Sequence, residues 1–207
     1  MTTEVSARRA ATRDRLVDAA MTVFAERGVV GATVEEICEA AGFTRGAFYS
    51  NFESKDELCV AVLEHQYEAN LAAMRDALAA VDSLGDAGLD ELIPRAIAVF
   101  LSSQQSGRIW VLSGQELRLY AARTPALAVA YRRLYTTATR TMAAVLEEAV
   151  EALGCELLPG GAEAIGVLHA VHDYGAVGSL IGSDTIEGDV KVRLLTEVLR
   201  ALVRPRR

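Results

Sequence analysis

The segment from Thr33 to Lys55, TVEEICEAAGFTRGAFYSNFESK, constrains the fold most, because it carries start and stop signals for two short helices in close succession. Thr33 and Glu36 have capping-box spacing, which begins the first helix, and Gly42 is suited to end it. Thr44 can cap the second helix. Two short helices joined by a glycine-containing turn are typical of a helix-turn-helix, whose second helix enters the DNA major groove. The segment therefore predicts DNA binding.

The residues after this turn predict a small core and a third helix. Phe48 and Phe52 lie four positions apart, so they share the inner face of the second helix. Phe43 is expected in the same core. Ser54 and Glu57 repeat the capping-box spacing and predict the start of another helix.

A series of sequence blocks carries a family resemblance. They are RLVDAA (15–20), VFAERG (23–28), TVEEI (33–37), AGFTRG (41–46), FYSNF (48–52) and SK (54–55). Over about the first quarter of the chain, these blocks resemble the N-terminal domain of the tetracycline-repressor (TetR) family of bacterial transcription regulators. One departure is Asn51, where the family usually has His. The resemblance implies a small DNA-binding domain followed by a larger helical body that binds a small molecule and forms a dimer.

The predicted DNA-binding residues are Thr33, Thr44, Arg45, Gly46, Ala47, Tyr49, Asn51 and Lys55. The guanidinium of Arg45 matches guanine O6 and N7, or a phosphate. The resemblance implies that Tyr49, Asn51 and Lys55 contact the DNA backbone and that Arg45 and Ala47 lie nearer the bases. The alternative is that Tyr49 and Asn51 only complete a helix, while Arg45 and Lys55 are solvated.

Composition is compatible with an ordered helical protein, although its charge is unusual for a DNA binder. The chain has 207 residues, of which 51% are hydrophobic, and a formal net charge of −7. Nucleic-acid binders are usually basic, so a DNA-binding face here depends on local positive charge. The candidates for that charge are Arg8, Arg9, Arg13, Arg15, Arg45 and Lys55.

Cysteine usage and hydropathy place the chain in the cytoplasm. Cys38, Cys59 and Cys155 are widely spaced and form no CxxC pair, so free thiols are expected. An uninterrupted apolar stretch of about 18 residues, as a membrane helix requires, is absent from the sequence. The GxSxG, HExxH and phosphate-binding glycine-loop motifs of common enzyme classes are also absent, and we expect no enzyme.

The apolar periodicity predicts an all-α fold of about nine helices. Besides the two short helices above, they are expected at about 12–27, 54–81, 89–105, 107–122, 125–153, 162–182 and 187–203, with breaks at 82–86, 154–161 and 182–184. We expect a helix-turn-helix domain over 1–56 and a helical ligand-binding and dimerisation domain over 57–207. Mobile ends are expected at residues 1–11 and 204–207, and a solvated face at Glu147, Glu148 and Glu151.

The body offers candidates for an effector site. A cavity for a small hydrophobic or aromatic molecule is expected among Phe100, Trp110, Glu116, Tyr120, Tyr135, Met142, His169 and His172. The alternative is that these side chains are ordinary core. His169, His172 and Asp173 also have partial metal-ligand spacing, but no third ligand is evident, so no metal or other cofactor is expected.

The last two helices are the candidates for dimerisation. The expected interface residues are Val167, Val171, Gly175, Gly178, Leu194 and Val198, unless these helices only complete the subunit core. The sequence thus predicts a homodimeric, ligand-responsive repressor that binds a palindromic operator. The alternatives are ligand-independent or corepressor-dependent DNA binding, and a helical enzyme that uses His169, His172 and Asp173.

Overall fold

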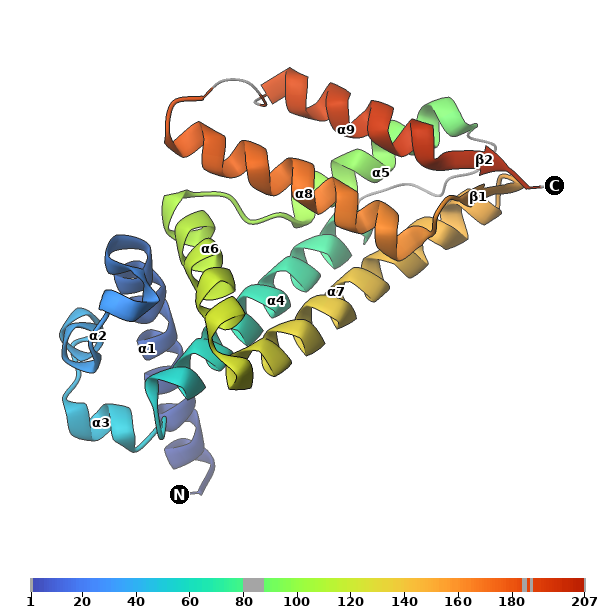
Figure 1. The fold of residues 1–207 in the computed structure, drawn as a ribbon. Helices are drawn as coiled ribbons and strands as arrows, with labels where there is room; N and C mark the ends of the chain where they lie inside the picture. The colour runs from blue at the N-terminus through green and yellow to red at the C-terminus, as the bar shows by residue number, and fades with distance from the viewer. Residues whose placement is uncertain (1, 80–87, 184–185, 187, 207) are drawn as a thin grey trace. The chain divides into compact units, whose positions relative to one another are not determined.

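The computed structural model describes residues 2–79, 88–183, 186 and 188–206, and side chains from residue 7 onward. Its elements are α1 (Thr2–Gly31), α2 (Val34–Ala41), α3 (Arg45–Tyr49), α4 (Lys55–Ala79), α5 (Leu89–Ser103), α6 (Arg108–Arg123), α7 (Pro125–Glu151), β1 (Cys155–Leu157), α8 (Gly161–Leu180), α9 (Gly188–Leu202) and β2 (Val203–Pro205) (Figure 1). The all-α prediction is confirmed. The predicted break at 82–86, and residue 184 of the predicted break at 182–184, lie outside the described residues.

The start and stop signals of α2 and α3 act as predicted. Thr33 Oγ1 accepts the Glu36 N–H, and the Glu36 carboxylate accepts the Thr33 N–H, which completes the capping box. Gly42 ends α2 with a φ of 69°, in the left-handed region that glycine adopts without strain. Thr44 Oγ1 accepts the Ala47 N–H at the start of α3. Local sequence therefore defines both helices of the helix-turn-helix.

The capping box predicted at the start of α4 forms only in part. Ser54 Oγ accepts the Glu57 N–H at 3.1 Å, as expected. The Glu57 carboxylate, however, accepts the N–H of Glu53 at 2.7 Å, one residue before the predicted cap. The start of α4 is thus fixed by two hydrogen bonds that are not reciprocal.

Helix α1 is longer than predicted. Residues 2–11, expected as a mobile arm, continue the helix, and its last turn is interrupted at Gly28, where φ is 71° and ψ is 160°. One contact that sequence cannot reveal holds the early turns: Arg9 Nη2 donates to the Ser50 carbonyl at 3.1 Å. A tertiary hydrogen bond therefore ties this part of α1 to the end of α3.

The chain divides into two compact units, each with its own core. The first comprises residues 1–68 and 107–134, and the second comprises 69–106 and 135–207. The unit that contains the helix-turn-helix therefore also includes α6, which the sequence assigns to the body. The reason is packing: α6 lies against α1, Gln66 Nε2 donates to Ser113 Oγ at 3.0 Å, and Tyr120 Oη donates to Asp56 Oδ1 at 2.8 Å.

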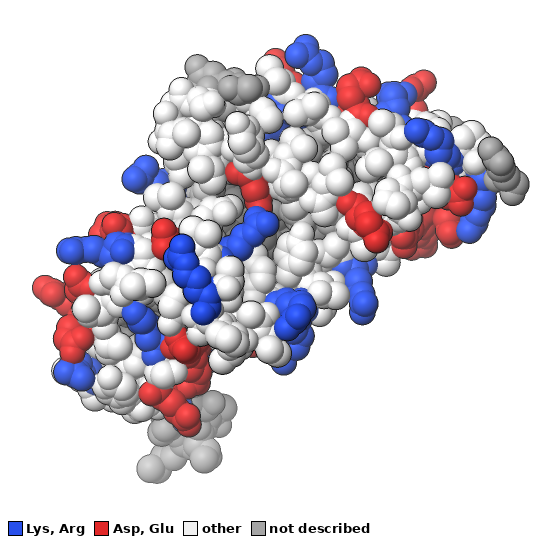
Figure 2. All heavy atoms as spheres, viewed as in Figure 1, with Lys and Arg blue, Asp and Glu red and all other residues white. Residues whose placement is uncertain are grey.

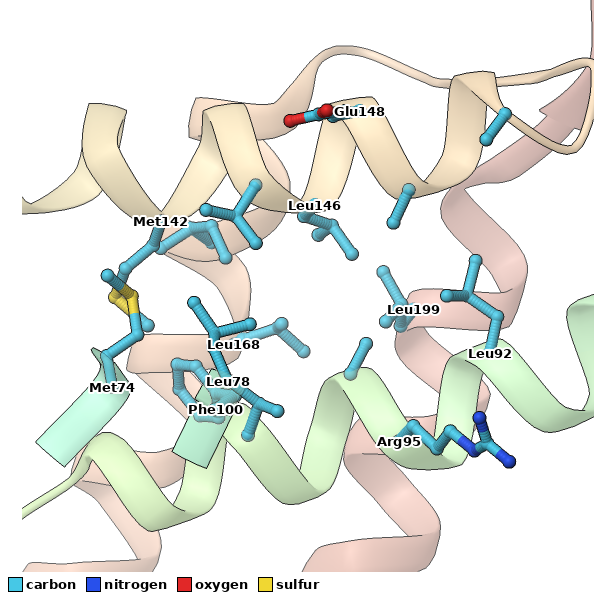
Figure 3. Close-up of a pocket in the computed structure, with 16 residues that line it drawn as sticks. Met74, Leu78, Leu92, Arg95, Phe100, Met142, Leu146, Glu148, Leu168 and Leu199 are labelled. Carbon is cyan, nitrogen blue, oxygen red and sulfur yellow. The ribbon is translucent and has the colours of Figure 1, made fainter. Parts of the chain in front are cut away.

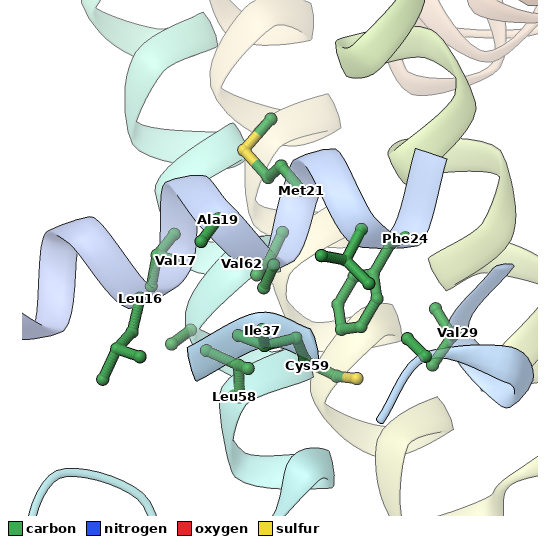
Figure 4. Close-up of a cluster of buried hydrophobic side chains, with 14 of the residues drawn as sticks. Leu16, Val17, Ala19, Met21, Phe24, Val29, Ile37, Leu58, Cys59 and Val62 are labelled. Carbon is green, nitrogen blue, oxygen red and sulfur yellow. The ribbon is translucent and has the colours of Figure 1, made fainter. Parts of the chain in front are cut away.

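The first core is continuous and aromatic. Phe24, Phe48 and Phe52 are fully buried, and the ring centroids of Phe48 and Phe52 lie 5.7 Å apart. Figure 4 shows Leu16 and Phe24 of α1 together with Ile37, Leu58 and Val62 of α2 and α4 in this core. The predicted burial of Phe48 and Phe52 is confirmed, and Phe43 is partly buried against the same cluster.

The second core is formed by α5, α7, α8 and α9. Helix α9 packs against both α5 and α8, and the buried side chains include Ile97, Phe100, Leu168, Leu195 and Leu199. None of the helices in the described ranges is both long enough and apolar enough to cross a membrane.

Two predicted solvent-exposed segments have structural roles in the second unit. The Glu147 carboxylate accepts the N–H of Gly161 at 2.7 Å and so caps α8, and a Cβ at Gly161 would collide with this carboxylate. The C-terminal residues, expected to fray, form β2, which pairs antiparallel with β1. Arg206 also bonds to Glu151 at 3.0 Å. Glu147, Glu148 and Glu151 are exposed, as predicted, whereas the expected fraying of the C-terminal residues is wrong, because their partners in β1 lie far away in sequence.

All three cysteines are free, as predicted, and all three are buried. Burial raises the pKa of the Cys38 thiol, and it raises the pKa of Cys59 to about 12. The thiolate is the reactive form of cysteine. Cys38 and Cys59 therefore serve as small apolar core residues.

Candidate DNA-binding surface and ligand cavity

The outer face of α3 presents Arg45, Gly46 and Tyr49. All three are exposed, and the Tyr49 side chain is 51% exposed although it neighbours the fully buried Phe48. The two rings pack edge to face, with centroids 5.2 Å apart. Packing against the buried Phe48 ring therefore orients the Tyr49 side chain outward from the core. A phosphate could accept a hydrogen bond from the hydroxyl of this exposed side chain.

Arg45 is held by two neighbours. Its Nη1 lies 2.7 Å from Glu35 Oε1 on α2, and its guanidinium carbon lies 5.8 Å from the centroid of the Tyr49 ring. A hydrogen bond with Tyr49, and then the nearby Glu35 charge, raise the pKa of Arg45. The residue predicted to read bases is thus exposed, charged and already engaged by a carboxylate.

The first turn of α2 is occupied by its own cap. Thr33 Oγ1 donates to Glu36 Oε2 at 2.9 Å and accepts the Glu36 N–H at 3.2 Å. These hydrogen bonds, first from the Thr33 backbone and then from its side chain, hold the pKa of Glu36 below its usual value. Thr33 is exposed, but its hydroxyl is committed to the capping box.

Asn51 has an internal role that differs from its predicted one. The residue is buried, and its Nδ2 donates to Ala47 O at 2.7 Å and to Ser50 Oγ at 3.2 Å. Both amide N–H groups are therefore used inside the protein, which leaves none for the predicted phosphate contact in this conformation. The physical reason is position: Asn51 lies just past α3, beside the buried Phe52.

Lys55 also serves the fold. Its Nζ donates to the carbonyls of Val29 and Ala32, at 2.8 and 2.9 Å. These carbonyls lie where α1 ends and the chain turns toward α2. Lys55 thus fastens the start of α4 to this turn, and only one of its three N–H groups remains for a phosphate.

Three arginines of α1, expected to supply charge for DNA, are directed at the ends of the other helices. Arg13 Nη1 donates to Asn51 O at 3.1 Å, and Arg15 Nη2 donates to Ala41 O at 2.7 Å; Arg9 bonds to Ser50 as described above. Cations favour helix C-termini, where carbonyls lack partners. Figure 2 shows basic and acidic side chains interspersed on the face of the molecule that it draws.

The second unit contains an apolar cavity of about 350 Å³. Its lining comes from α4, α5, α7, α8 and α9 and comprises Met74, Leu78, Leu92, Arg95, Ala96, Val99, Phe100, Met142, Val145, Leu146, Glu148, Ala149, Ala152, Ile165, Leu168 and Leu199. Figure 3 shows the charged groups of Arg95 and Glu148 directed away from the centre, and Arg95 pairs with Glu91. The cavity therefore suits a ligand with a largely apolar body.

Five of the predicted effector residues lie in or near this cavity. Phe100 and Met142 line it. The Phe100 ring centroid lies 5.2 Å from that of His169 and 6.1 Å from that of His172, and Tyr135 lies 6.2 Å from His169. His172 and its neighbours thus lie next to a cavity-lining ring without lining the cavity themselves.

His172 is the most perturbed of these groups. It is 8% exposed, and no described residue hydrogen-bonds to its Nδ1. Burial, then the charge of Lys191 and then His169, lower the pKa of His172 to about 4. The imidazole is therefore neutral at pH 7, with one buried nitrogen unsatisfied.

The other three predicted effector residues belong to α6 in the first unit and are not among the lining residues. Tyr120 donates to Asp56, and the Trp110 ring lies 6.0 Å from His65. Glu116 lies so close to Gly28 that a Cβ there would come within 2.8 Å of its carboxylate oxygen. Sequence reasoning missed this arrangement because nothing local shows that α6 packs on α1.

The predicted dimer residues divide into exposed and internal positions. Val167 and Leu194 are exposed, whereas Val171 and Val198 pack partly against the second core. A Cβ at Gly175 would lie 2.7 Å from the carbonyl of Ile186, so this glycine is needed inside the subunit. Tyr174 and Ile181 of the same region are more exposed, at 66% and 78%, and are further candidates for the interface.

Among the described residues, the fold brings no further metal ligands to His169, His172 and Asp173 of α8. Across the described ranges, no cluster of three or more His, Cys, Asp or Glu side chains is arranged to hold a metal ion. His172 is buried beside Phe100, as described above.

Comparison with known proteins gives two kinds of match. Residues 16–62 match the family model "Bacterial regulatory proteins, tetR family". TtgR of Pseudomonas putida, an HTH-type transcriptional regulator, is 41% identical over 76 residues, which cover 36% of each chain. TtgW of the same species, an uncharacterized HTH-type regulator, is 39% identical over 84 residues, or 32% of this chain and 63% of TtgW. The chain thus spans less than two thirds of these relatives.

Solved structures match over most of the chain. GusR of Salmonella enterica has a TM-score of 0.69 at 24% identity, covering 93% of this chain and 95% of GusR. A putative transcriptional regulator from Saccharomonospora viridis, in complex with choline, has a TM-score of 0.72 at 16% identity, covering 94% and 98%. These similarities establish the fold of both units. The sequence match to the tetR family of bacterial regulatory proteins covers residues 16–62, which contain the helix-turn-helix, and the similarity of the remaining residues is one of fold.

Proposed function

We propose that the protein is a transcriptional regulator that binds a palindromic DNA operator as a homodimer and is released by a small apolar effector. The observation that carries this proposal is the outer face of α3, where Arg45, Gly46 and Tyr49 are exposed on a helix-turn-helix with both caps in place. The named relatives are transcriptional regulators, which points away from an enzyme. Such a protein would act on the chromosome in the cytoplasm.

The DNA complex follows from the geometry of the motif. Helix α3 would enter the major groove, with Arg45 toward base edges and Tyr49 toward a phosphate. A single short helix contacts few base pairs, so two copies related by a two-fold axis would read half-sites about one helical turn, or 34–36 Å, apart. Exposed residues of α8 and α9, including Tyr174, Ile181 and Val167, offer apolar area for that dimer.

Effector control would act through α4. This helix supplies Lys55, which bonds to the end of α1, and also Met74 and Leu78, which line the cavity. A ligand that prefers one packing of Met74 and Leu78 would shift the equilibrium between conformations of α4. Coupling of about 1–3 kcal/mol would change operator affinity by roughly 5–150-fold.

In the test, fragmented DNA from the source genome is incubated with the purified protein at near-physiological salt, and the fragments that bind are sequenced. We expect a palindrome to be enriched and the enrichment to disappear with Arg45→Ala combined with Tyr49→Ala, both at exposed positions. Arg132→Ala, which removes the same charge from an exposed position of α7, serves as the control. Weak, salt-sensitive and sequence-independent retention would contradict the proposal.

A second measurement separates effector control from ligand-independent binding. Candidate apolar compounds are titrated into the protein–operator complex, and the same titration is repeated with Leu168→Trp, which would fill the cavity. We expect release of the operator in the first case and none in the second. Release that is unchanged by Leu168→Trp would place the effector elsewhere, and a regulator that no compound releases would favour the ligand-independent alternative.

A further inference from the structure

A surface ion pair joins α2 and α3, the two helices of the helix-turn-helix. Glu35, in the first turn of α2, lies 2.7 Å from Arg45, the first residue of α3. The side chains are 56% and 61% exposed, so the pair faces solvent. A helix-turn-helix directs the N-terminal part of its second helix toward the bases. A carboxylate is therefore bound to the arginine best placed to read DNA.

We propose that Glu35 is a specificity-determining residue, which acts by competing with non-cognate DNA for the Arg45 guanidinium. This inference rests on the proposed function. In the free protein Arg45 binds Glu35, and it must leave this carboxylate to bind a guanine or a phosphate. Glu35 thereby opposes every DNA contact of Arg45, and the opposition is overcome best where the DNA offers the best alternative partner.

The two possible DNA partners differ in how well they replace the carboxylate. A guanine edge offers O6 and N7, two fixed acceptors that match the guanidinium fork. A phosphate on non-cognate DNA offers a solvated, less constrained contact, and Glu35 itself repels it. Specificity is a difference between affinities, and it increases when a repulsive element acts mainly on the wrong partner.

Glu36 and Glu39, the neighbouring carboxylates of α2, do not replace Glu35 as the partner of Arg45. Glu36 is committed to the capping box and lies 3.6 Å from Arg27. Glu39 carries the same charge on the exposed side of α2 but is not paired with Arg45. Tyr49 is the second neighbour of the guanidinium, with its ring centroid 5.8 Å from the guanidinium carbon and a side-chain hydrogen bond to it. Arg45 is thus held between one carboxylate and one aromatic hydroxyl.

The test compares Glu35→Gln with the wild-type protein by fluorescence anisotropy on two labelled duplexes of equal length, the selected palindrome and a scrambled sequence. Exposed ion pairs contribute up to about 1 kcal/mol, or roughly fivefold. We expect affinity for the scrambled duplex to rise about three- to fivefold and affinity for the palindrome to rise less. The ratio of the two affinities should therefore fall.

Two controls make the result specific. Glu39→Gln removes the same charge from the same helix and should change both affinities by the same factor, which leaves the ratio unchanged. In an Arg45→Ala background, Glu35→Gln should no longer alter the ratio, because the competition acts through Arg45. Thermal unfolding of each variant verifies that these surface substitutions leave the fold intact.

Three outcomes would overturn the inference. The first is a ratio that Glu35→Gln leaves unchanged. The second is a loss of affinity for the palindrome alone, which would mean that Glu35 itself accepts a hydrogen bond from a base. The third is a wild-type protein that binds both duplexes equally, and this result would overturn the proposed function as well.

Discussion

The first unit closes its core around Phe24, Phe48 and Phe52, whereas the second unit packs Phe100 and Leu168 around a cavity of about 350 Å³. Their polar side chains differ as well. In the first unit, lysine and arginine side chains bond to main-chain carbonyls at the ends of α1, α2 and α3. In the second, the charged groups at the cavity are directed away from its centre.

This contrast shows how one chain can combine precision with adaptability. Hydrogen bonds from side chains to particular carbonyls fix the helix-turn-helix in one geometry, as recognition of base edges requires. An apolar cavity has few directional contacts, so its walls can repack around a guest. Under the proposed function, the hydrogen-bonded helix-turn-helix would keep one geometry for DNA and the cavity would adapt to the effector.

The largest expected effect tests the two cores directly. Phe48→Ala removes a fully buried ring from a closely packed core and should lower the free energy of unfolding by about 3–5 kcal/mol. Phe100→Ala enlarges an existing void, where the ring already lacks some partners, and should cost at least about 1 kcal/mol less. Urea unfolding of both variants measures the difference. Equal losses would contradict the contrast between the cores.

A smaller effect separates structural from DNA-facing side chains within the first unit. Lys55→Met leaves the carbonyls of Val29 and Ala32 without their charged donor and should cost about 1–3 kcal/mol of stability. Tyr49→Phe removes an exposed hydroxyl whose hydrogen bond is with the exposed Arg45 side chain, so it should change stability by less than about 0.5 kcal/mol while weakening operator binding. Chemical denaturation and DNA titration are run on both variants. A stable Lys55→Met protein that has lost only DNA affinity would return Lys55 to the DNA contacts.

Side-chain caps should contribute similar amounts to stability in the two units, so the contrast between the units should not extend to helix capping. Thr33→Ala removes a local cap of α2, and Glu147→Ala removes a cap that reaches α8 from α7. Each should cost about 0.5–2 kcal/mol in thermal or urea unfolding. The neighbouring Glu148→Ala is the control and should have little effect. A negligible loss for Glu147→Ala would show that the long-range cap is not maintained in solution.

The smallest expected effect is the pH dependence of stability that His172 contributes in the second unit. His172 has a pKa of about 4 when folded and about 6.5 when unfolded, so the unfolded chain binds the proton more tightly. Stability contributed by the neutral imidazole is therefore present above pH 6.5 and is lost as pH falls toward 4. Between pH 7.5 and 6 the loss should be under about 1 kcal/mol. His172→Gln should remove it, whereas His65→Gln, in the first unit, should not.

The features that sequence predicted are those that depend on neighbouring residues. The capping box of Thr33 and Glu36, the left-handed Gly42 and the buried pair Phe48 and Phe52 all follow from spacings of three or four residues. The same spacings account for the nine helices of the described chain and for most of their ends. Effector and dimer assignments remain predictions.

The features that sequence missed depend on contacts across long separations. Lys55 bonds to carbonyls 23 and 26 residues away, and Tyr120 bonds to Asp56 across 64 residues. The family resemblance marked Lys55 and Asn51 as phosphate contacts. In the structure Lys55 donates to distant carbonyls, and Asn51 donates to Ala47 and Ser50, which are close in sequence. A candidate donor on the surface of a motif is available to DNA only if the fold has not already used it.

The most direct test of sequence-specific DNA binding is hydrogen–deuterium exchange of the protein with and without its selected palindrome. We predict that the palindrome protects peptides covering residues 33–37 and 44–50, and that a scrambled duplex protects them much less. Protection confined to α8 and α9, or identical protection by both duplexes, would contradict the claim that the exposed face of α3 and the start of α2 read DNA sequence.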